Sequence, residues 1–543
     1  MRPTSFASRA SSALVAVAIA SGSSTAGPRV VPAPEIPRGD GPSLVVLLVV
    51  DQLRGDYLDR FAPVLDGGLA WLVENGASYT DAHQNHSMTA TAPGHATIAT
   101  GVEPSRSGIV DNSWFNRETG LAEYSAAISR SPANLEATAL GDWLKAADVR
   151  SKVFAVSAKD RSAVMMGGQR PDGAYWYGSS DGAWITSSYY TRAARPWLEV
   201  FNDQNWLRRY EGVAWEPVLG PEVHDDLGIV ELDTGVVPSG FPHALGSYSV
   251  HRGSSFYNAI YGTPFVDAHM AELAKTLIDN ERLGLDGSPD LLALSFSALD
   301  SVGHDYGPDS PEVLDTIVRL DALLGDLIAH LDATVGLEHV VFGLSSDHGV
   351  VDYPEVRQLR GQSGHRLGAE DVVCVQQAGV QLREEFGDKP WLQYGFYLDR
   401  DLVVAEGLDP AAMATRLAEI VSGCEAVERA WTDAEIAALP ENSGTVSEQR
   451  HRNNYFPGRG PDVVLQLREN YLYNGSGLGT THGSSYDYDS WVPMIFAGPG
   501  INARTSDRRV ATVDMAPTLA ALFGVTTPVD LHGVDLGADF ADR

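Results

Sequence analysis

Three short clusters of carboxylate and imidazole side chains supply atoms that could bind metal ions. Asp300 and His304 are four residues apart, so on a helical turn both side chains can reach one ion. Mixed oxygen and nitrogen ligation without thiolates suits zinc, typically at about 2.0–2.2 Å. Each pair alone is common in ordinary loops and helix caps, and only their combination in one chain indicates a metal site. The residues concerned are Asp51, Asp300, His304, Asp347, His348 and His482.

A hydroxyl nucleophile is available in the stretch from Thr89 to Gly101, which is typical of a turn entering a helix. Thr91 would lie at the helix N-terminus, where free N–H groups and the positive end of the helix dipole favour an anion. A divalent ion lowers the pKa of such a hydroxyl and makes it competent to attack an ester. The alternative is that Thr91 is only a helix cap, the commoner fate of threonine there. We expect a structural role for His95.

Buried strands must position the three carboxylates. Three continuous apolar runs are typical of strands that are buried on both faces of a parallel sheet, and one acid follows each run. In folds of this kind, ligands bind beyond the carboxyl ends of the strands. The runs and their acids are 43–50 with Asp51, 291–296 with Asp300, and 339–344 with Asp347.

The remaining pattern alternates between strands and helices. Apolar residues at helical spacing predict a helix over 311–331, and another is expected over 513–523. Residues 491–497 are a further candidate strand, weakened by Pro493. This alternation predicts an α/β fold with a mostly parallel central sheet and helices on both faces.

Two stretches interrupt the alternation and are expected to be insertions that shape a cleft. The first covers about 162–265 and is rich in Trp, Tyr, Gly and Ser. The second covers about 352–475 and contains helical pieces such as 410–421. Both would belong to one catalytic region, 43–543.

Composition excludes several classes of protein. The chain has 543 residues, of which 44% are hydrophobic and 20% charged, so bulk disorder is excluded. Its net charge of −32 repels phosphate backbones and argues against a general nucleic-acid binder. Two cysteines exclude a disulfide scaffold and a Cys-rich metal cluster, although export would permit a Cys374–Cys424 disulfide.

The N-terminus has the pattern of an export signal. Two arginines precede the apolar run 13–20, and small residues follow up to Ala26. This predicts a signal peptide over 1–26 and a Pro-rich linker over 27–42, with a disordered tail as the alternative. The run is too short to span a bilayer, which needs about 20 apolar residues. We therefore expect an exported protein, periplasmic or secreted, with no membrane span.

Read together, these residues resemble the alkaline phosphatase superfamily of two-zinc hydrolases, and within it the PafA-type, phosphate-irrepressible periplasmic alkaline phosphatases. The resemblance runs from Asp51 to His482 in the family's order. It implies that Thr91, before Ala-Pro-Gly-His, is the nucleophile and forms a phosphothreonine intermediate. Asn112, in Asp-Asn-Ser-Trp, would bind a phosphoryl oxygen.

The resemblance also implies the metal content, two Zn²⁺ per subunit. One zinc would be held by Asp300, His304 and His482. The other would be held by Asp51, Asp347 and His348, with the Thr91 oxygen bridging toward it.

The Lys159-Asp-Arg161 element of the same family bears on the substrate class. A phosphate monoester carries two negative charges, which an arginine fork and a lysine point charge can neutralise together. A diester has a second organic group where one cation would sit. On a surface strand, Lys159 and Arg161 would share one face. The pair therefore favours small-molecule phosphate monoesters as substrates, and no obligate protein partner is expected; a solvated turn is the alternative for the element.

Two rival functions stay open. A phosphodiesterase or nucleotide pyrophosphatase of the same superfamily would share the zinc ligands, a threonine and an asparagine, without the cationic pair. A non-catalytic, zinc-containing phosphate-binding protein would keep the ligands without needing a nucleophile. A sulfatase is disfavoured because the chain has no Cys-x-Pro-x-Arg element.

Overall fold

A computed structural model of the chain describes residues 41–190, 195–232, 240–245, 256–441, 443–474 and 479–540. The predicted signal peptide, 1–26, and all but the end of the predicted linker, 27–42, lie outside these residues. No helix among the described residues has the length and apolar character that crossing a membrane requires.

One large sheet organises the described chain, and it is mostly parallel, as predicted. Only β18 and β7 run against their neighbours. Pro493 lies at an irregularity in β18, where the pairing with β2 shifts register. The spatial order is β19 (Arg504–Ser506), β2 (Gly76–His83), β18 (Trp491–Ala497), β11 (Val340–Ser345), β1 (Leu44–Val50), β10 (Asp290–Phe296), β5 (Val153–Ser157), β6 (Gly173–Tyr177) and β7 (Trp184–Ile185), with β20 (Val510–Ala511) beside β2.

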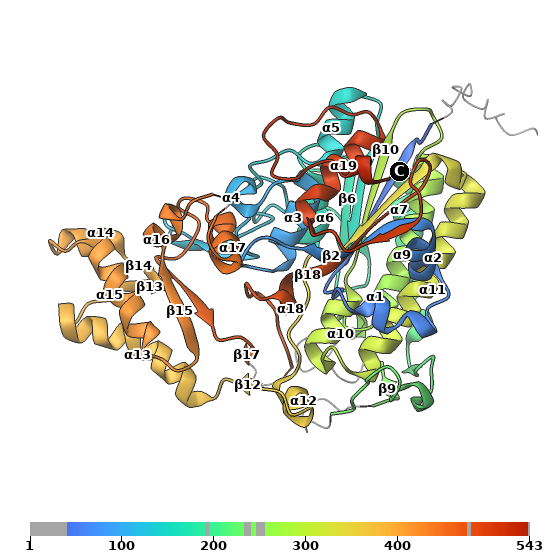
Figure 1. Cartoon of the computed structure of the whole chain (residues 1–543). Coiled ribbons are helices and arrows are strands. Elements are labelled where there is room, and N and C mark those ends of the chain that lie inside the picture. Colours follow the sequence, from blue (N-terminus) through green and yellow to red (C-terminus); the bar gives the residue numbers. More distant parts are fainter. Residues whose placement is uncertain are drawn as a thin grey trace, which may run out of the picture. The chain divides into compact units, whose positions relative to one another are not determined.

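Helices cover both faces of this sheet (Figure 1). Successive residues of β1 alternate between the two cores, because neighbouring side chains of a strand point to opposite faces; Leu48 lies in one core and Leu47 in the other. One face packs against α2 (Gly68–Asn75), α9 (Phe265–Glu281), α10 (Ala298–Tyr306) and α11 (Pro311–Thr334). The other packs against α3 (Thr91–Thr100), α5 (Leu140–Ala147), α6 (Asp160–Gly167) and α19 (Met515–Leu522).

The helix predicted over 311–331 is confirmed as α11, which continues to Thr334. Ser310 caps it by accepting the N–H of Val313, and Pro311 occupies the first turn, where a missing N–H costs no hydrogen bond. The helix predicted over 513–523 is present as α19, after a short 3₁₀ turn.

The expected start of the first insertion, residue 162, is wrong. Helix α6 and strand β6 fall after that border, yet β6 pairs with β5 in the central sheet. The aromatic run Tyr175–Tyr177 that suggested an insertion is buried core of that strand. The elements after β7 do not extend the large sheet but pack on the core of one of its faces: α7 (Pro196–Asp203), β8 (Ala214–Trp215), β9 (His243–Ala244) and α8 (Phe256–Ile260).

The second insertion forms a substructure with its own small core, and we call residues 354–472 the cap. Its described strands pair only with one another. A disulfide joins Cys374 to Cys424. This is the pairing that the sequence allowed for an exported protein. The cap elements are α12 (Pro354–Leu359), β12 (His365–Arg366), α13 (Ala369–Phe386), β13 (Leu392–Tyr394), β14 (Tyr397–Leu398), α14 (Arg400–Ala405), α15 (Pro410–Ser422), β15 (Val427–Thr432), α16 (Asp433–Ala438), α17 (Val446–Asn454), β16 (Val463–Leu467) and β17 (Tyr471–Leu472).

Candidate active site

The three predicted acids lie beyond the carboxyl ends of adjacent parallel strands. Asp51 directly follows β1, Asp347 follows β11, and Asp300 stands in the first turn of α10 after β10. β1 pairs with both β10 and β11, so the three strand ends share one edge of the sheet. The topology therefore gathers carboxylates that are far apart in the sequence.

Asp300, His304 and His482 form the first group that could hold a metal ion. The Oδ1 atom of Asp300 lies 3.2 Å from Nε2 of His304 and 3.5 Å from Nε2 of His482. Because α10 places residues 300 and 304 one turn apart, both side chains point to the same side. His482 comes from a distant loop.

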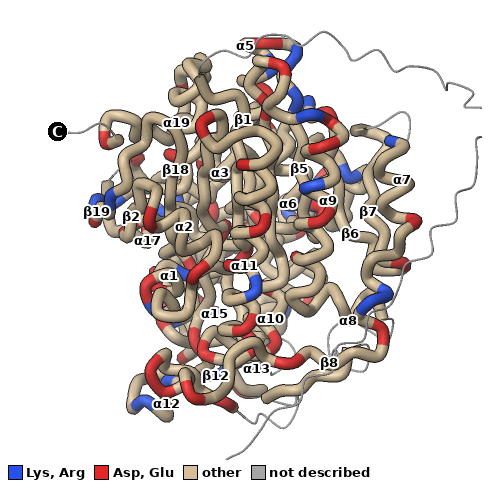
Figure 2. Tube along the Cα trace, turned by 90° about the vertical axis from the view of Figure 1, so that its right-hand side faces the viewer, with Lys and Arg blue, Asp and Glu red and all other residues tan. Residues whose placement is uncertain are grey.

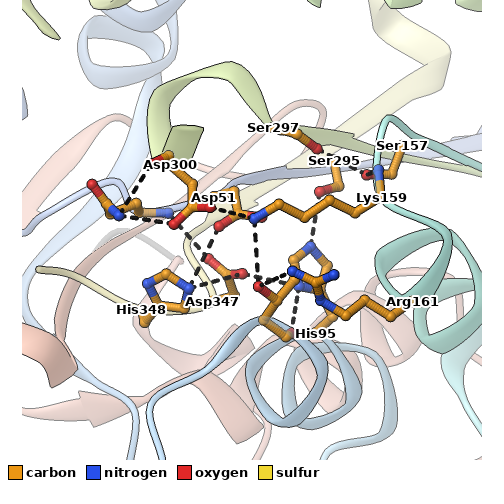
Figure 3. Close-up of polar contacts among 12 residues, drawn as sticks. Asp51, His95, Ser157, Lys159, Arg161, Ser295, Ser297, Asp300, Asp347 and His348 are labelled. Carbon is orange, nitrogen blue, oxygen red and sulfur yellow. Dashed lines mark hydrogen bonds and ion pairs between the residues drawn. The ribbon is translucent and has the colours of Figure 1, made fainter. Parts of the chain in front are cut away.

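Asp51, Asp347 and His348 form the second group. The Nε2 atom of His348 lies 3.5 Å from Oδ1 of Asp51 and 3.6 Å from Oδ2 of Asp347. All three side chains are completely buried. Figure 3 shows them converging, with Asp300 beside them.

Both groups suit divalent cations with tetrahedral ligation. Ligands about 2.0–2.1 Å from a tetrahedral zinc are about 3.4 Å from one another, close to the distances between the nitrogen and carboxylate atoms here. In the second group Oδ1 of Asp51 and Nε2 of His348 are buried without a hydrogen-bond partner among the described residues. Burial and the nearby charge of Asp347 raise the pKa of Asp51 well above its ordinary value. A bound cation would relieve this excess of negative charge.

The three histidines are oriented for ligation through Nε2. In each ring Nδ1 lies at hydrogen-bond distance from a main-chain carbonyl: His304 at 2.8 Å from Thr480, His482 at 2.7 Å from Thr89, and His348 at 2.9 Å from Gly349. A hydrogen bond donated by Nδ1 leaves the Nε2 lone pair free for an ion. Burial lowers the pKa of His348 to about 3, so this ring is neutral, as a metal ligand must be.

Thr91 is the first residue of α3 and is 1% exposed. The next N–H, that of Ala92, donates to Oδ1 of Asn112 at 2.8 Å, which leaves the amide NH₂ of Asn112 as its donor group. His95, one turn along, contacts the Thr91 carbonyl and lies 3.1 Å from Oδ2 of Asp347. The nucleophile candidate, Asn112 and the second metal group are thus connected through one helix terminus.

Gly94 allows α3 to pack directly on the second metal group. A Cβ atom at this position would lie 2.2 Å from the carbonyl oxygen of Asp347 and 2.7 Å from its Cα, too close for atoms of the main chain. We expect Gly94→Ala to push Thr91 and Asp347 apart and to lower kcat/KM by about 100-fold, since a shift of about 1 Å can have that effect. Steady-state kinetics and the metal content of the purified variant would measure this.

Gly325→Ala is the matched control for this substitution. Gly325 is also helical, in α11, and an added Cβ would meet its nearest atom at 3.4 Å, an ordinary contact. This variant should fold and turn over normally. Equal kinetics for the two variants would contradict the packing argument.

Lys159 and Arg161 both reach Thr91, although not from a strand. The expectation that they share a face of a surface strand is wrong, because Lys159 is the N-cap residue of α6 and Arg161 is in its first turn. The Nζ atom of Lys159 lies 3.5 Å from Oγ1 of Thr91, and Nη2 of Arg161 lies 3.2 Å from it. Nε of Arg161 is buried without a hydrogen-bond partner among the described residues.

Lys159 also links the two metal groups, a contact that its sequence position did not reveal. Its Nζ atom lies 2.6 Å from Oδ2 of Asp51 and 2.5 Å from Oδ2 of Asp300 (Figure 3). Burial opposes the charge of Lys159, but Asp300 and Asp51 outweigh it and raise the pKa of the ammonium group. Burial by itself would raise the pKa of Asp300. The positive charges of His304 and Lys159 outweigh this effect, so the pKa of Asp300 lies well below its ordinary value.

Two supporting residues were missed by sequence reasoning. Gln52 has a left-handed backbone (φ 69°); its side-chain amide donates to Oδ1 of Asp300 at 2.8 Å and its N–H donates to Oδ1 of Asp347. Asp489 accepts the N–H and hydroxyl of Ser484, and its carbonyl accepts the N–H of Gly349. Gln52 thus connects ligands of the two groups, and Asp489 connects the loop of His482 with the residue that follows His348. A glutamine or aspartate in a loop carries no distinctive pattern, although the position of Gln52 beside Asp51 was a weak signal.

The chain is similar to known proteins over most of its length. The sequence model of the family described as type I phosphodiesterase / nucleotide pyrophosphatase matches residues 45–487. Alkaline phosphatase PafA of Elizabethkingia meningoseptica is 30% identical over 518 residues, covering 90% of this chain and 92% of that protein. Alkaline phosphatase PhoV of Synechococcus elongatus is 30% identical over 512 residues, covering 90% and 91%. The crystal structure of wild-type PafA matches with a TM-score of 0.82 at 29% identity, over 92% of this chain and 99% of that one.

Proposed function

Because the chain belongs to the type I phosphodiesterase / nucleotide pyrophosphatase family, and is thus a hydrolase of the alkaline phosphatase superfamily, we propose that it hydrolyses phosphate monoesters through a phosphorylated Thr91. The observation that carries this proposal is the pair of cationic side chains, Lys159 and Arg161, within 3.5 Å of the Thr91 hydroxyl. A dianionic phosphoryl group needs such charge, and a diester needs less of it.

In this proposal Oγ1 of Thr91 loses its proton to water and attacks the phosphorus atom. The bond from phosphorus to Thr91 forms as the bond to the ester oxygen breaks, and that oxygen takes up a proton from water as the alcohol departs. Arg161, Lys159 and the amide of Asn112 hold the non-bridging oxygens, over which charge is spread in the transition state. A water molecule then cleaves the phosphothreonine and releases inorganic phosphate, which regenerates the hydroxyl.

Two zinc ions would be held by the two groups of ligands already described, Asp51 with Asp347 and His348, and Asp300 with His304 and His482. When bound, they would supply the Lewis acidity that lowers the pKa of the Thr91 hydroxyl and neutralises charge on the leaving oxygen. The attack takes place beside the group of Asp51, Asp347 and His348, and the alcohol departs on the side of the group of Asp300, His304 and His482. The identity of the metal as zinc and the count of two ions per chain are both parts of this proposal.

Removing the metal should abolish turnover reversibly. Because the ligand atoms come from loops and helices that are far apart in sequence, dialysis against a chelator should also lower the thermal unfolding temperature. Metal analysis of the purified protein should find two zinc ions per chain, and adding zinc back should restore activity. Full activity in metal-depleted protein would contradict the assignment of both groups.

The deciding experiment compares an aryl phosphate with the corresponding bis-aryl phosphate on the same preparation. We expect the monoester to react faster. A faster diester reaction would favour the phosphodiesterase or nucleotide pyrophosphatase alternative, for which the family is also named. Zinc content without any product burst would favour the non-catalytic phosphate-binding alternative.

The charge of the protein bears on its substrates and partners. Figure 2 shows basic residues scattered among more numerous acidic ones in the described chain. With a net charge of −32, the protein is proposed to act on small-molecule esters drawn in by the local cations of the site, with neither a nucleic acid nor an obligate protein partner. Export through the segment 1–26 is part of the same proposal.

A further inference from the structure

A cavity of about 640 Å³ lies between the cap and segments outside it, which include residues 110–117 and 481–489. Its wall includes Asp111, which precedes Asn112, and Thr481 with the metal-ligand candidate His482. The cavity therefore begins at the side of the site from which, under the proposed function, the leaving alcohol departs. Its volume is far larger than a phosphoryl group needs and is typical of sites for small organic ligands.

Nine Phe, Trp and Tyr residues of the described chain lie in the wall of this cavity. They come from both sides: Trp114 and Tyr488 belong to separate segments outside the cap, and most of the others belong to the cap. Tyr394 is 54% exposed, and its ring is stacked on Phe115, with an angle of 9° between the planes. Half-exposed tyrosines of this kind offer a flat, rigid surface to another ring. The aromatic residues of the wall include Trp114, Tyr394, Tyr397, Tyr455, Phe456 and Tyr488.

The arginines of the wall are already neutralised. Arg117 pairs with Asp462 at 2.7 Å and lies over the ring of Tyr397. Arg459 pairs with Glu136 and lies over the ring of Trp114. Arg400 pairs with Asp433 and Asp462. Cations held in this way are poor receptors for a second anionic group, so the wall favours an uncharged guest.

We propose that this cavity is a leaving-group subsite that binds uncharged aromatic groups of about nucleoside size, stacked against Tyr394 and its aromatic neighbours. The inference rests on the proposed function, because it takes the phosphoryl group to be held at Thr91. The occupant is the alcohol portion of a monoester, and the cap supplies most of the surface that selects it.

Two esters test the subsite because they differ only by an aromatic ring system. Adenosine 5′-monophosphate and ribose 5-phosphate share a primary ester, so their intrinsic reactivities are similar. We expect kcat/KM for adenosine 5′-monophosphate to be about 10-fold higher, which corresponds to one or two good aromatic contacts. Tyr394→Ala should reduce this ratio toward one, and Tyr394→Phe, which keeps the ring, should preserve it.

Tyr189→Ala is the matched control. Tyr189 is 51% exposed and packs against the ring of Tyr190, but it lies outside the cavity, so its removal should leave the ratio unchanged. A ratio near one in the unmodified protein, or a ratio insensitive to Tyr394→Ala, would overturn the subsite while leaving the monoesterase intact. No turnover of either ester would instead overturn the proposed function, and the subsite with it.

Discussion

Thr91→Ala should lower the turnover of a phosphate monoester by a factor of about 10³ or more while the protein keeps its metal ions. Losses of this size are typical when a covalent nucleophile is removed and the rest of the site is intact. The metal ions should stay because three other residues supply ligands to each group. Steady-state kinetics and metal analysis of the variant measure both halves of this expectation.

Two companion measurements sharpen the test of the nucleophile. Rapid quenching of the unmodified enzyme in acid, followed by peptide mass spectrometry, should find phosphate on Thr91, and the variant should show none. Thr97→Val is a suitable control, because its buried hydroxyl on the same helix has no hydrogen-bond partner among the described residues. Near-native turnover of Thr91→Ala would eliminate the proposed mechanism.

Arg161→Ala should lower kcat/KM for a monoester by about 10²–10³ and that for a diester by much less. One preorganised donor to developing charge is typically worth this much. The diester presents less negative charge to the guanidinium group, so it loses less when the group is removed. Both rates are measured on the same aryl leaving group.

Lys159→Ala should show the same preference without a loss of metal affinity. Lys159 contacts Asp51 and Asp300 as well as Thr91, so its removal takes away a positive charge that competes with a divalent cation for these two carboxylates. Arg170→Ala is the control, because Arg170 is an exposed arginine just beyond the same helix.

An equal loss of kcat/KM on monoester and diester in the Arg161 variant would remove the argument for monoester specificity.

Much of the fold was predictable because buried parallel strands have a simple signature. The apolar runs ending before Asp51 and Asp347 are confirmed as β1 and β11, and the run before Asp300 as β10. Trp491–Ala497 is a strand too, but it runs antiparallel, which a run of apolar residues cannot indicate. The first insertion was misplaced because aromatic residues that pack inside a sheet resemble those of a binding loop.

The family assignment drawn from the short motifs is confirmed. The roles of individual residues stay predictions, although the structure brings the proposed ligands into two compact groups beside Thr91. Lys159 and Arg161 illustrate the limit of motif reading. Their residue types predicted a site for negative charge, but their location on a helix terminus, and the two carboxylates that Lys159 contacts, followed from packing alone.

The amino-acid sequence alone indicated metal-dependent ester hydrolysis as the chemistry, the order of the strands along the chain and the identities of the ligand candidates. These features depend on residue type and on spacing over a few positions. Only the tertiary structure decided which atoms meet. Contacts such as those of Gln52 with Asp300, or of the cap with the loop of His482, join residues separated by tens to hundreds of positions, and no local pattern encodes such a pairing. The cavity at the cap belongs to the same class, since its wall is made by residues of the cap together with loops far from them in the sequence.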